Sequence, residues 1–256
     1  MSRRRRLASE FTAAWKAFLR RRTAVFFTFF FPAIIVVIFG ALVGTRPTGG
    51  GLFAQPPGYY VPGYLAVVVL FTPLSRVGSE VARHREGRRF EKLATTPLRR
   101  WEWLLAQTLV NVVVIGLTAL LLLGLTAAIT PATIPLDPAA LLLVPFVVAG
   151  VALFCGVGAV LGGLADSQDG VIAASNALAF PLLFLSEAFL TPDMLPAWLR
   201  PAMAASPVSL FARGVRALTF DPAAAGPLGV PGALAALAAV AAVGLVAGAV
   251  SIPRTD

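Results

Sequence analysis

The stretch TAVFFTFFFPAIIVVIFGALVG, residues 23–44, decides the fold class. It carries no charged side chain, and about 20 apolar residues are enough for a helix to cross the hydrocarbon core of a bilayer. Its apolar core is about twice as long as that of a signal peptide, and no clear A-x-A cleavage site follows it. We therefore expect a transmembrane helix that stays in the protein.

Five further uncharged runs follow along the chain, at residues 47–75, 103–136, 138–165, 170–186 and 222–253. A mean hydropathy of +0.83 and a hydrophobic content of 58% place the chain among membrane proteins. The run of 34 residues at 103–136 is too short for two spans and a turn. We predict an all-α integral membrane protein with a single domain over residues 1–256 and six spans, at about 24–44, 59–77, 103–128, 139–164, 170–190 and 230–250.

The basic residues are distributed unevenly around these six spans. Eight Lys and Arg residues precede the first span, eight lie between Arg76 and Arg100, and Arg254 follows the last span. Six spans place these 17 on one side and leave four on the other, namely Arg46, Arg200, Arg213 and Arg216. By the positive-inside rule we expect both termini in the cytoplasm and the protein in the cell (inner or plasma) membrane. The net charge of +9 then reflects topology and attraction to anionic membrane lipid, and we expect no nucleic-acid partner.

Two amphipathic segments flank the spans. Apolar residues recur at helical spacing within residues 3–22, which predicts an interfacial helix that either anchors the chain or transmits motion. The segment 191–221 is half apolar and contains four prolines, which favours short re-entrant helices in the outer leaflet before the last span. Three G-x-x-x-G pairs favour close packing inside the protein over a dimer seam, namely Gly40/Gly44, Gly158/Gly162 and Gly244/Gly248.

The sequence offers little catalytic chemistry. It has no G-x-x-x-x-G-K-[ST] phosphate loop, one His and one Cys, so we expect no ATPase activity, no metal site and no cofactor of its own. The polar residues Asn111, Asn176, Ser186 and Glu187 lie within the predicted spans and mark a possible substrate path. Glu187 falls near the outer end of its span, where it either meets a substrate or reaches outer water.

A charged patch at residues 83–103, RHREGRRFEKLATTPLRRWEW, holds seven of the 21 basic side chains. We predict a surface helix at about residues 86–96, with Phe90 and Leu93 on an apolar face and Pro97 ending the helix. Two interpretations are possible from the residues alone. The patch is a loop that sets topology, or it is a docking surface for a protein that supplies the missing ATPase.

Three segments in order resemble the permease subunits of type-2 ABC transporters (drug and polysaccharide exporters). These segments are WKAFLRRRTAVFFTFFFPAIIVVIFGALVG, EKLATTPLRRWEWLLAQ and LTPDMLPAWLRPAMAASPVSLFARGVRAL. The second is similar to the motif E-x-L-x-x-T-P, carried by Glu91, Leu93, Thr96 and Pro97. The chain departs from the family at Arg88, where a Gly usually stands three residues before the acidic position, and Gly87 lies one residue earlier.

The resemblance implies that the helix at about 86–96 is a cytoplasmic coupling helix, which seats in a groove of a separate ABC ATPase subunit. The implied contacts are Glu86, Arg89, Phe90, Glu91, Leu93, Ala94, Thr96 and Pro97. It further implies a dimer of identical or paralogous permeases, ATP bound by the partner, and export of a drug, lipid or polysaccharide. The alternative is a membrane scaffold or assembly protein without transport activity.

Overall fold

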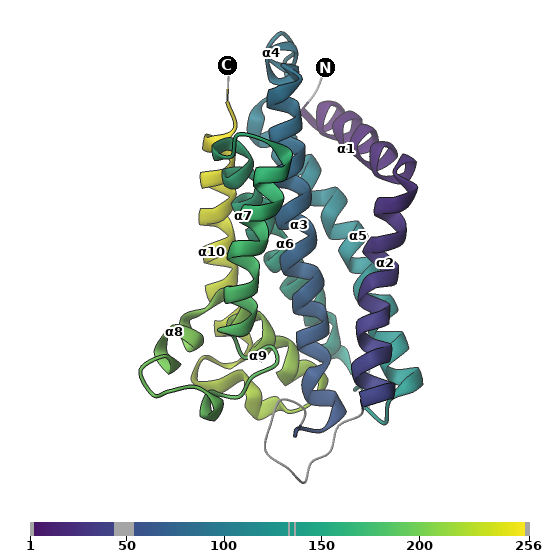
Figure 1. Ribbon diagram of the computed structural model, residues 1–256, viewed down its shortest axis with the longest axis vertical. Helices are drawn as coiled ribbons and strands as arrows, with labels where there is room; N and C mark the ends of the chain where they lie inside the picture. The colour runs from purple at the N-terminus through teal and green to yellow at the C-terminus, as the bar shows by residue number, and fades with distance from the viewer. Residues whose placement is uncertain (1–2, 44–53, 133, 136, 254–256) are drawn as a thin grey trace.

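The computed structural model describes residues 3–43, 54–132, 134–135 and 137–253, and these residues form helices and connecting segments without a β-strand (Figure 1). The longer helices are α1 (Arg3–Arg20), α2 (Arg22–Val36), α3 (Val61–Glu86), α5 (Arg100–Ile129), α6 (Leu143–Leu164), α7 (Gln168–Phe184), α9 (Pro207–Thr219) and α10 (Gly229–Ser251). The shorter ones are η1 (Val37–Val43), η2 (Pro57–Tyr60), α4 (Arg89–Ala94), η3 (Pro138–Leu142), η4 (Pro192–Met194), α8 (Arg200–Ala205) and η5 (Pro222–Leu228).

Five helical stretches among the described residues are long and apolar enough to cross a membrane, namely Arg22–Gly40, Pro57–Glu86, Arg100–Ile129, Pro138–Leu164 and Pro222–Ser251. The class of all-α membrane protein is therefore confirmed. The span expected at 170–190 corresponds to α7, whose 17 residues lie at the lower limit of about 17 for a spanning helix. It ends at Phe184, within a turn of Pro181, so the count of six spans stays a prediction.

The helices run between two ends of the molecule. The end of α3, the helix α4, the start of α5 and the end of α10 lie together, and α1 lies obliquely across the same end (Figure 1). We call this the α4 end. The helices α8 and α9 lie at the opposite end (Figure 1). The start of α1 and the end of α10 thus lie at the same end of the molecule (Figure 1).

Helix α3 is the centre of the bundle and packs most closely against α6. A Cβ atom added at Gly162 would lie 2.3 Å from the Gly78 carbonyl oxygen, and one at Gly158 would lie 2.4 Å from that of Leu74. Glycines on α10 meet α6 in the same way, because a Cβ at Gly248 would lie 2.6 Å from the Gly156 carbonyl oxygen. These two G-x-x-x-G pairs therefore pack inside the chain, while Gly44 of the third lies outside the described residues.

Two helices extend beyond the expected spans at the α4 end. Helix α3 continues to Glu86, past the expected end of the second span at residue 77. Its last turns carry charged side chains that make the contacts described below. Helix α5 begins at Arg100, ahead of the expected start of the third span at residue 103, because Glu102 caps that helix. The bounds of the spans in a membrane stay predictions. The segment 191–221 forms short helices as expected, but its depth in a membrane stays a prediction.

Candidate functional site

The last turns of α3 form a polar platform at the α4 end. The carboxylate of Glu80 receives ion pairs from Arg83 of its own helix and from Arg21, whose Nη1 lies 3.5 Å away. His84 adds a contact, with its Nδ1 3.5 Å from Glu80 Oε1. The charged side chains of α3 at this level are therefore paired with one another and with Arg21 where the helix leaves the apolar part of the bundle.

Arg85 and Glu86 then fix the connection between α6 and α7. The Arg85 guanidinium donates to the carbonyl oxygens of Gly163, at 2.8 Å, and of Ala165. These carbonyls belong to the last turn of α6 and to its C-cap residue, where the helix dipole also stabilises a cation. The Glu86 carboxylate accepts from the backbone and side-chain nitrogens of Gln168, both at 3.1 Å, at the start of α7.

The chain reverses after α3 through Gly87 and Arg88. Arg88 has φ 49° and ψ 32° and is the one non-glycine residue with positive φ among the described residues. A side chain in the left-handed region costs about 1 kcal/mol or more relative to glycine. Arg88 stands at the position where the resemblance noted above implies Gly, so this departure of the sequence coincides with the conformation that glycine adopts most readily.

Helix α4 is shorter than expected. It spans six residues instead of about 86–96, because Glu86 belongs to α3 and the helix ends three residues before Pro97. The Thr95 hydroxyl donates to the Lys92 carbonyl and the Thr96 hydroxyl to the Leu93 carbonyl, each at 2.7 Å. The two threonines satisfy the carbonyls at the end of the helix, which explains why it ends before the proline.

The aromatic ring of Phe90 packs into the chain. Its side chain is 7% exposed, and its ring centroid lies 5.3 Å from that of His84 and 5.5 Å from that of Trp103. The ring therefore packs mainly inside the chain, and its remaining face lines a groove together with Leu93 and Leu98. Its role as an anchor for a partner stays a prediction, and sequence reasoning did not foresee the contacts with His84 and Trp103.

The outward face of α4 is polar. Among the contacts implied by the family, Arg89, Thr96 and Pro97 are exposed, and Glu91 and Leu93 are half-buried. Glu86 is exposed but holds Gln168, and Lys92 adds an exposed cation. Ala94 ends the helix, and its side chain lies outside the described part of the chain. Their role in binding a partner stays a prediction.

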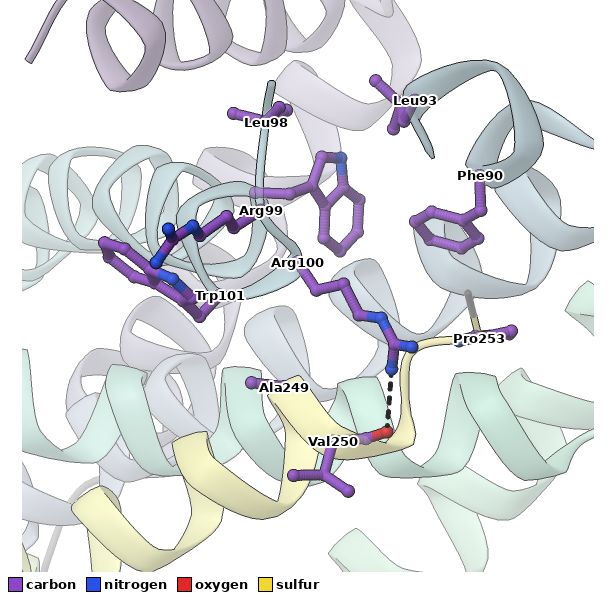
Figure 2. Close-up of a pocket in the computed structure, with 10 residues that line it drawn as sticks. Phe90, Leu93, Leu98, Arg99, Arg100, Trp101, Ala249, Val250 and Pro253 are labelled. Atoms are coloured by element: carbon purple, nitrogen blue, oxygen red, sulfur yellow. Dashed lines mark hydrogen bonds between the residues drawn. The ribbon is translucent and has the colours of Figure 1, made fainter. Parts of the chain in front are cut away.

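A groove of about 820 Å³ lies beside α4, between the start of α5 and the end of α10 (Figure 2). We call it the α4–α10 groove. It is lined by Phe90, Leu93, Leu98, Arg99, Arg100, Trp101, Trp103, Ala249, Val250 and Pro253. Arg100 reaches across it to donate from Nη1 to the Val250 carbonyl oxygen at 3.3 Å (Figure 2).

Glu102 ties the N-terminal helix to α5. It is fully buried and accepts from Arg6 Nη2 at 2.8 Å and Nε at 3.3 Å, which raises the pKa of Arg6. The Arg99 backbone N–H also donates to it at 2.9 Å. Arg3 adds a weaker ion pair at 3.9 Å. Sequence reasoning missed this residue, although an acid in the first turn of a helix is a capping signal that was present.

An apolar cavity of about 550 Å³ lies between α2, α3 and α7. Its lining includes phenylalanines from α2, α3 and α7 and the exposed side chain of Asn176. Asn176 is the one member of the predicted substrate path that lines it. The structure thus separates this residue from the other three.

Asn111 lies inside the bundle. It is fully buried, its Nδ2 donates to the Gln107 carbonyl at 2.8 Å, and its Oδ1 accepts from Arg76 Nη1 at 3.4 Å. The Arg76 guanidinium also stacks over the Phe18 ring at 4.3 Å. Asn111 therefore has a structural partner on α3.

Ser186 and Glu187 lie at the opposite end and are also engaged. The Ser186 hydroxyl is buried and donates to the Leu183 carbonyl at 2.6 Å. Glu187 Oε1 lies 3.8 Å from Arg213 Nε, and both side chains are mostly buried. Neither earlier alternative for Glu187, substrate contact or outer water, included this ion pair with α9.

Arg216 reinforces the same corner. It is 4% exposed, donates to the backbone oxygens of Tyr59 and Glu187, and stacks over the Tyr59 ring at 3.8 Å. Its burial lowers the pKa of the guanidinium. This residue holds the start of α3 against α9, and sequence reasoning used it only as a topology marker.

Comparison with known protein families identifies the family of the chain. A sequence model of the family described as ABC-2 type transporter matches residues 7–220, a region that runs from α1 through α9. It includes α3, α4 and most of the lining of both cavities. No curated protein matches the chain.

Proposed function

Because the chain belongs to the ABC-2 type transporter family, as a permease component in the membrane, we propose that it forms the pathway of an exporter powered by a separate ATP-hydrolysing subunit. The sequence itself has no phosphate-binding loop. ATP hydrolysis is therefore assigned to the partner, and the permease carries no catalytic residue.

One observation supports the docking site most strongly, namely the polar outer face of α4 on the rigid extension of α3. Arg89 and Lys92 are exposed there, while Phe90 fixes the helix from beneath. The platform is held to α6 and α7 by Arg85 and Glu86. A displacement of α4 by the partner is therefore transmitted to α7 through these contacts.

The uneven distribution of basic residues supports a cytoplasmic location for the α4 end. The N-terminal arginines and those of α3, α4 and the start of α5 all belong to this end. In the cell (inner or plasma) membrane, the positive-inside rule then places both termini in the cytoplasm.

The apolar cavity supports a hydrophobic or amphipathic substrate. Its walls come mainly from phenylalanine and aliphatic side chains, with Asn176 as a polar group. We propose that a second copy of the permease or a paralogue completes the pathway beside this cavity. Asn176 is the residue of the predicted path that we retain as a substrate contact.

The test is reconstitution with the partner ATPase, using a double variant, Arg89→Glu/Lys92→Glu. We expect purified permease alone to show no ATP hydrolysis, and the complex to show substrate-stimulated hydrolysis. The charge reversal should weaken binding of the ATPase about 10-fold or more in co-purification. The two new carboxylates would be repelled by the acidic groups of the partner that we expect to face Arg89 and Lys92. A matched control, Arg20→Glu/Arg22→Glu, changes the net charge equally on exposed residues away from α4.

Two results would contradict this function. Hydrolysis by a preparation free of other subunits would assign the ATPase to this chain. Normal ATPase binding by the α4 variant, together with no ATP-dependent transport by the wild type, would favour the scaffold alternative.

A further inference from the structure

We propose that the α4–α10 groove binds an anionic phospholipid from the adjacent leaflet, through the phosphate of its headgroup. The groove lies where the membrane helices end, since the start of α5 and the end of α10 line it (Figure 2). This level corresponds to the boundary between headgroups and acyl chains, where Trp and Arg side chains are favoured. The proposal does not depend on what the permease transports.

The charge of the groove favours an anion. Arg99 and Arg100 both line it, and none of its ten lining residues is acidic. Basic pockets on the cytoplasmic side of transmembrane helices are a recurrent way to bind anionic headgroups.

The rest of the lining favours a lipid over a soluble anion. Phe90, Leu93 and Leu98 form an apolar wall beside the two arginines (Figure 2). A volume of about 820 Å³ exceeds what a phosphate group needs and suits a headgroup with the glycerol and the first part of the chains. Inorganic phosphate would leave the apolar wall uncovered.

The groove is continuous with a lipid-facing surface. Val250 lines the groove and is 73% exposed, and Val246 and Val243 are exposed one and two turns earlier on α10. An acyl chain that starts in the groove can therefore follow the apolar side of α10 into the bilayer. A protein segment that docks from solution would leave this apolar side of α10 uncovered.

A buried donor behind the groove is consistent with a missing acceptor. The Trp103 side chain is 1% exposed, and its Nε1–H has no hydrogen-bond partner among the described residues. Leaving a buried donor unpaired is unfavourable. Oxygen atoms of a glycerophosphate supply acceptors of the kind this corner lacks.

The experiment is a lipid titration of the delipidated, detergent-solubilised full chain, followed by native mass spectrometry. The probes are dioleoyl phosphatidylglycerol, which is anionic, and dioleoyl phosphatidylcholine, which has the same chains and no net charge. We compare Arg99→Gln/Arg100→Gln with Arg20→Gln/Arg22→Gln, which removes the same charge from exposed residues outside the groove.

We expect the wild type to bind one phosphatidylglycerol at least about 10-fold more tightly than phosphatidylcholine. The groove variant should lose about 30-fold in phosphatidylglycerol affinity, at about fivefold per arginine. The control pair should change it by less than about threefold. If the double variant does not fold, the single change Arg99→Gln, at an exposed side chain, should still lose about fivefold.

Four outcomes would overturn the proposal. Equal losses in the groove and control variants would show only general attraction to charge. Equal wild-type affinity for both lipids would show that the headgroup charge is not recognised. Displacement of phosphatidylglycerol by millimolar inorganic phosphate would indicate a site for a soluble anion. Unchanged lipid binding with a loosened ATPase subunit would assign the groove to the protein partner.

Discussion

Helices α2 and α3 are both long apolar helices, yet they occupy opposite environments. In the most apolar 18-residue window of Arg22–Gly40, which contains α2, 11% of the residues are buried, whereas in that of Pro57–Glu86, which contains α3, 61% are buried. Helix α2 is the more hydrophobic of the two. It presents Phe26, Phe27, Phe30 and Phe31 outward, while α3 contacts α6 through glycine and carries the half-buried and paired Arg76 and Glu80.

This difference shows that hydropathy identifies a membrane-spanning helix but does not show whether the helix lies at the centre or at the periphery of the bundle. In lipid there is no hydrophobic force between helices, so small residues and paired polar groups mark the protein interior instead. A run of phenylalanines indicates contact with lipid as readily as a core. Four predictions test this contrast between the central and the peripheral helix.

The largest effect is expected where α6 meets α3. In Gly162→Leu the new side chain would collide with backbone atoms of α3, because even a Cβ lies 2.3 Å from the Gly78 oxygen. We expect a loss of roughly 5 kcal/mol or more, enough to prevent correct assembly. Size-exclusion chromatography should show aggregates. Gly116→Leu is the matched control on α5, where a Cβ meets nothing within 4 Å, and a similar loss there would break the contrast.

The next effect concerns two phenylalanines. Phe90→Ala removes a ring that is 7% exposed and packs under the end of α3, so we expect about 3 kcal/mol of destabilisation. Phe26→Ala removes a ring that is 51% exposed on α2 and should cost less than about 1 kcal/mol. Thermal unfolding in detergent, followed by tryptophan fluorescence, separates the two. Equal shifts would mean that α2 is packed as tightly as the platform.

A smaller effect should follow from the end of α3. Arg85→Gln removes the two charge-assisted bonds to the last turn of α6, and we expect a loss of about 2 kcal/mol. Arg22→Gln removes an exposed charge at the start of α2 and should leave the melting temperature nearly unchanged. Hydrogen exchange at residues 163–168 should rise in the first variant. Unaltered exchange there would show that the loop does not depend on α3.

The smallest effect has the opposite sign. Arg88→Gly relieves the left-handed conformation at φ 49°, and we expect stabilisation of about 1 kcal/mol. Arg89→Gly, one residue later inside α4, should destabilise by about 1 kcal/mol, because glycine is unfavourable in a helix. Chemical unfolding of both variants provides the comparison. The same sign for both would place the turn elsewhere than at Arg88.

Much of the fold could be predicted because its signals are local. The all-α membrane class follows from uncharged runs, and the amphipathic pattern indicates a surface helix at about residues 86–96, of which residues 89–94 form α4. The end of α3 could not be predicted from Arg76 and Glu80 alone, because Asn111 and Arg21, which contact them, come from other segments. The same reason applies to Phe90, whose neighbour Trp103 stands 13 residues later and is joined only by the fold.

The site residues divide in the same way. Asn176 could be identified as a polar group in an apolar helix, and it does line the cavity. Glu187 and Asn111 gave the same signal, yet they are engaged by Arg213 and Arg76. A polar residue in a span thus indicates a need for a partner, and the sequence does not say whether that partner is a ligand or the protein.

Arg85 and Glu86 restrict how α6 and α7 move relative to each other, because they are consecutive residues of α3 and move together. One holds the last carbonyls of α6 and the other holds the first turn of α7, so these two helix ends share few degrees of freedom. At the opposite end, α7 contains Pro181, which leaves a gap in its ladder of hydrogen bonds. The first turn of α7 is therefore held in place by α3, and bending of the helix is concentrated near Pro181, far from α4.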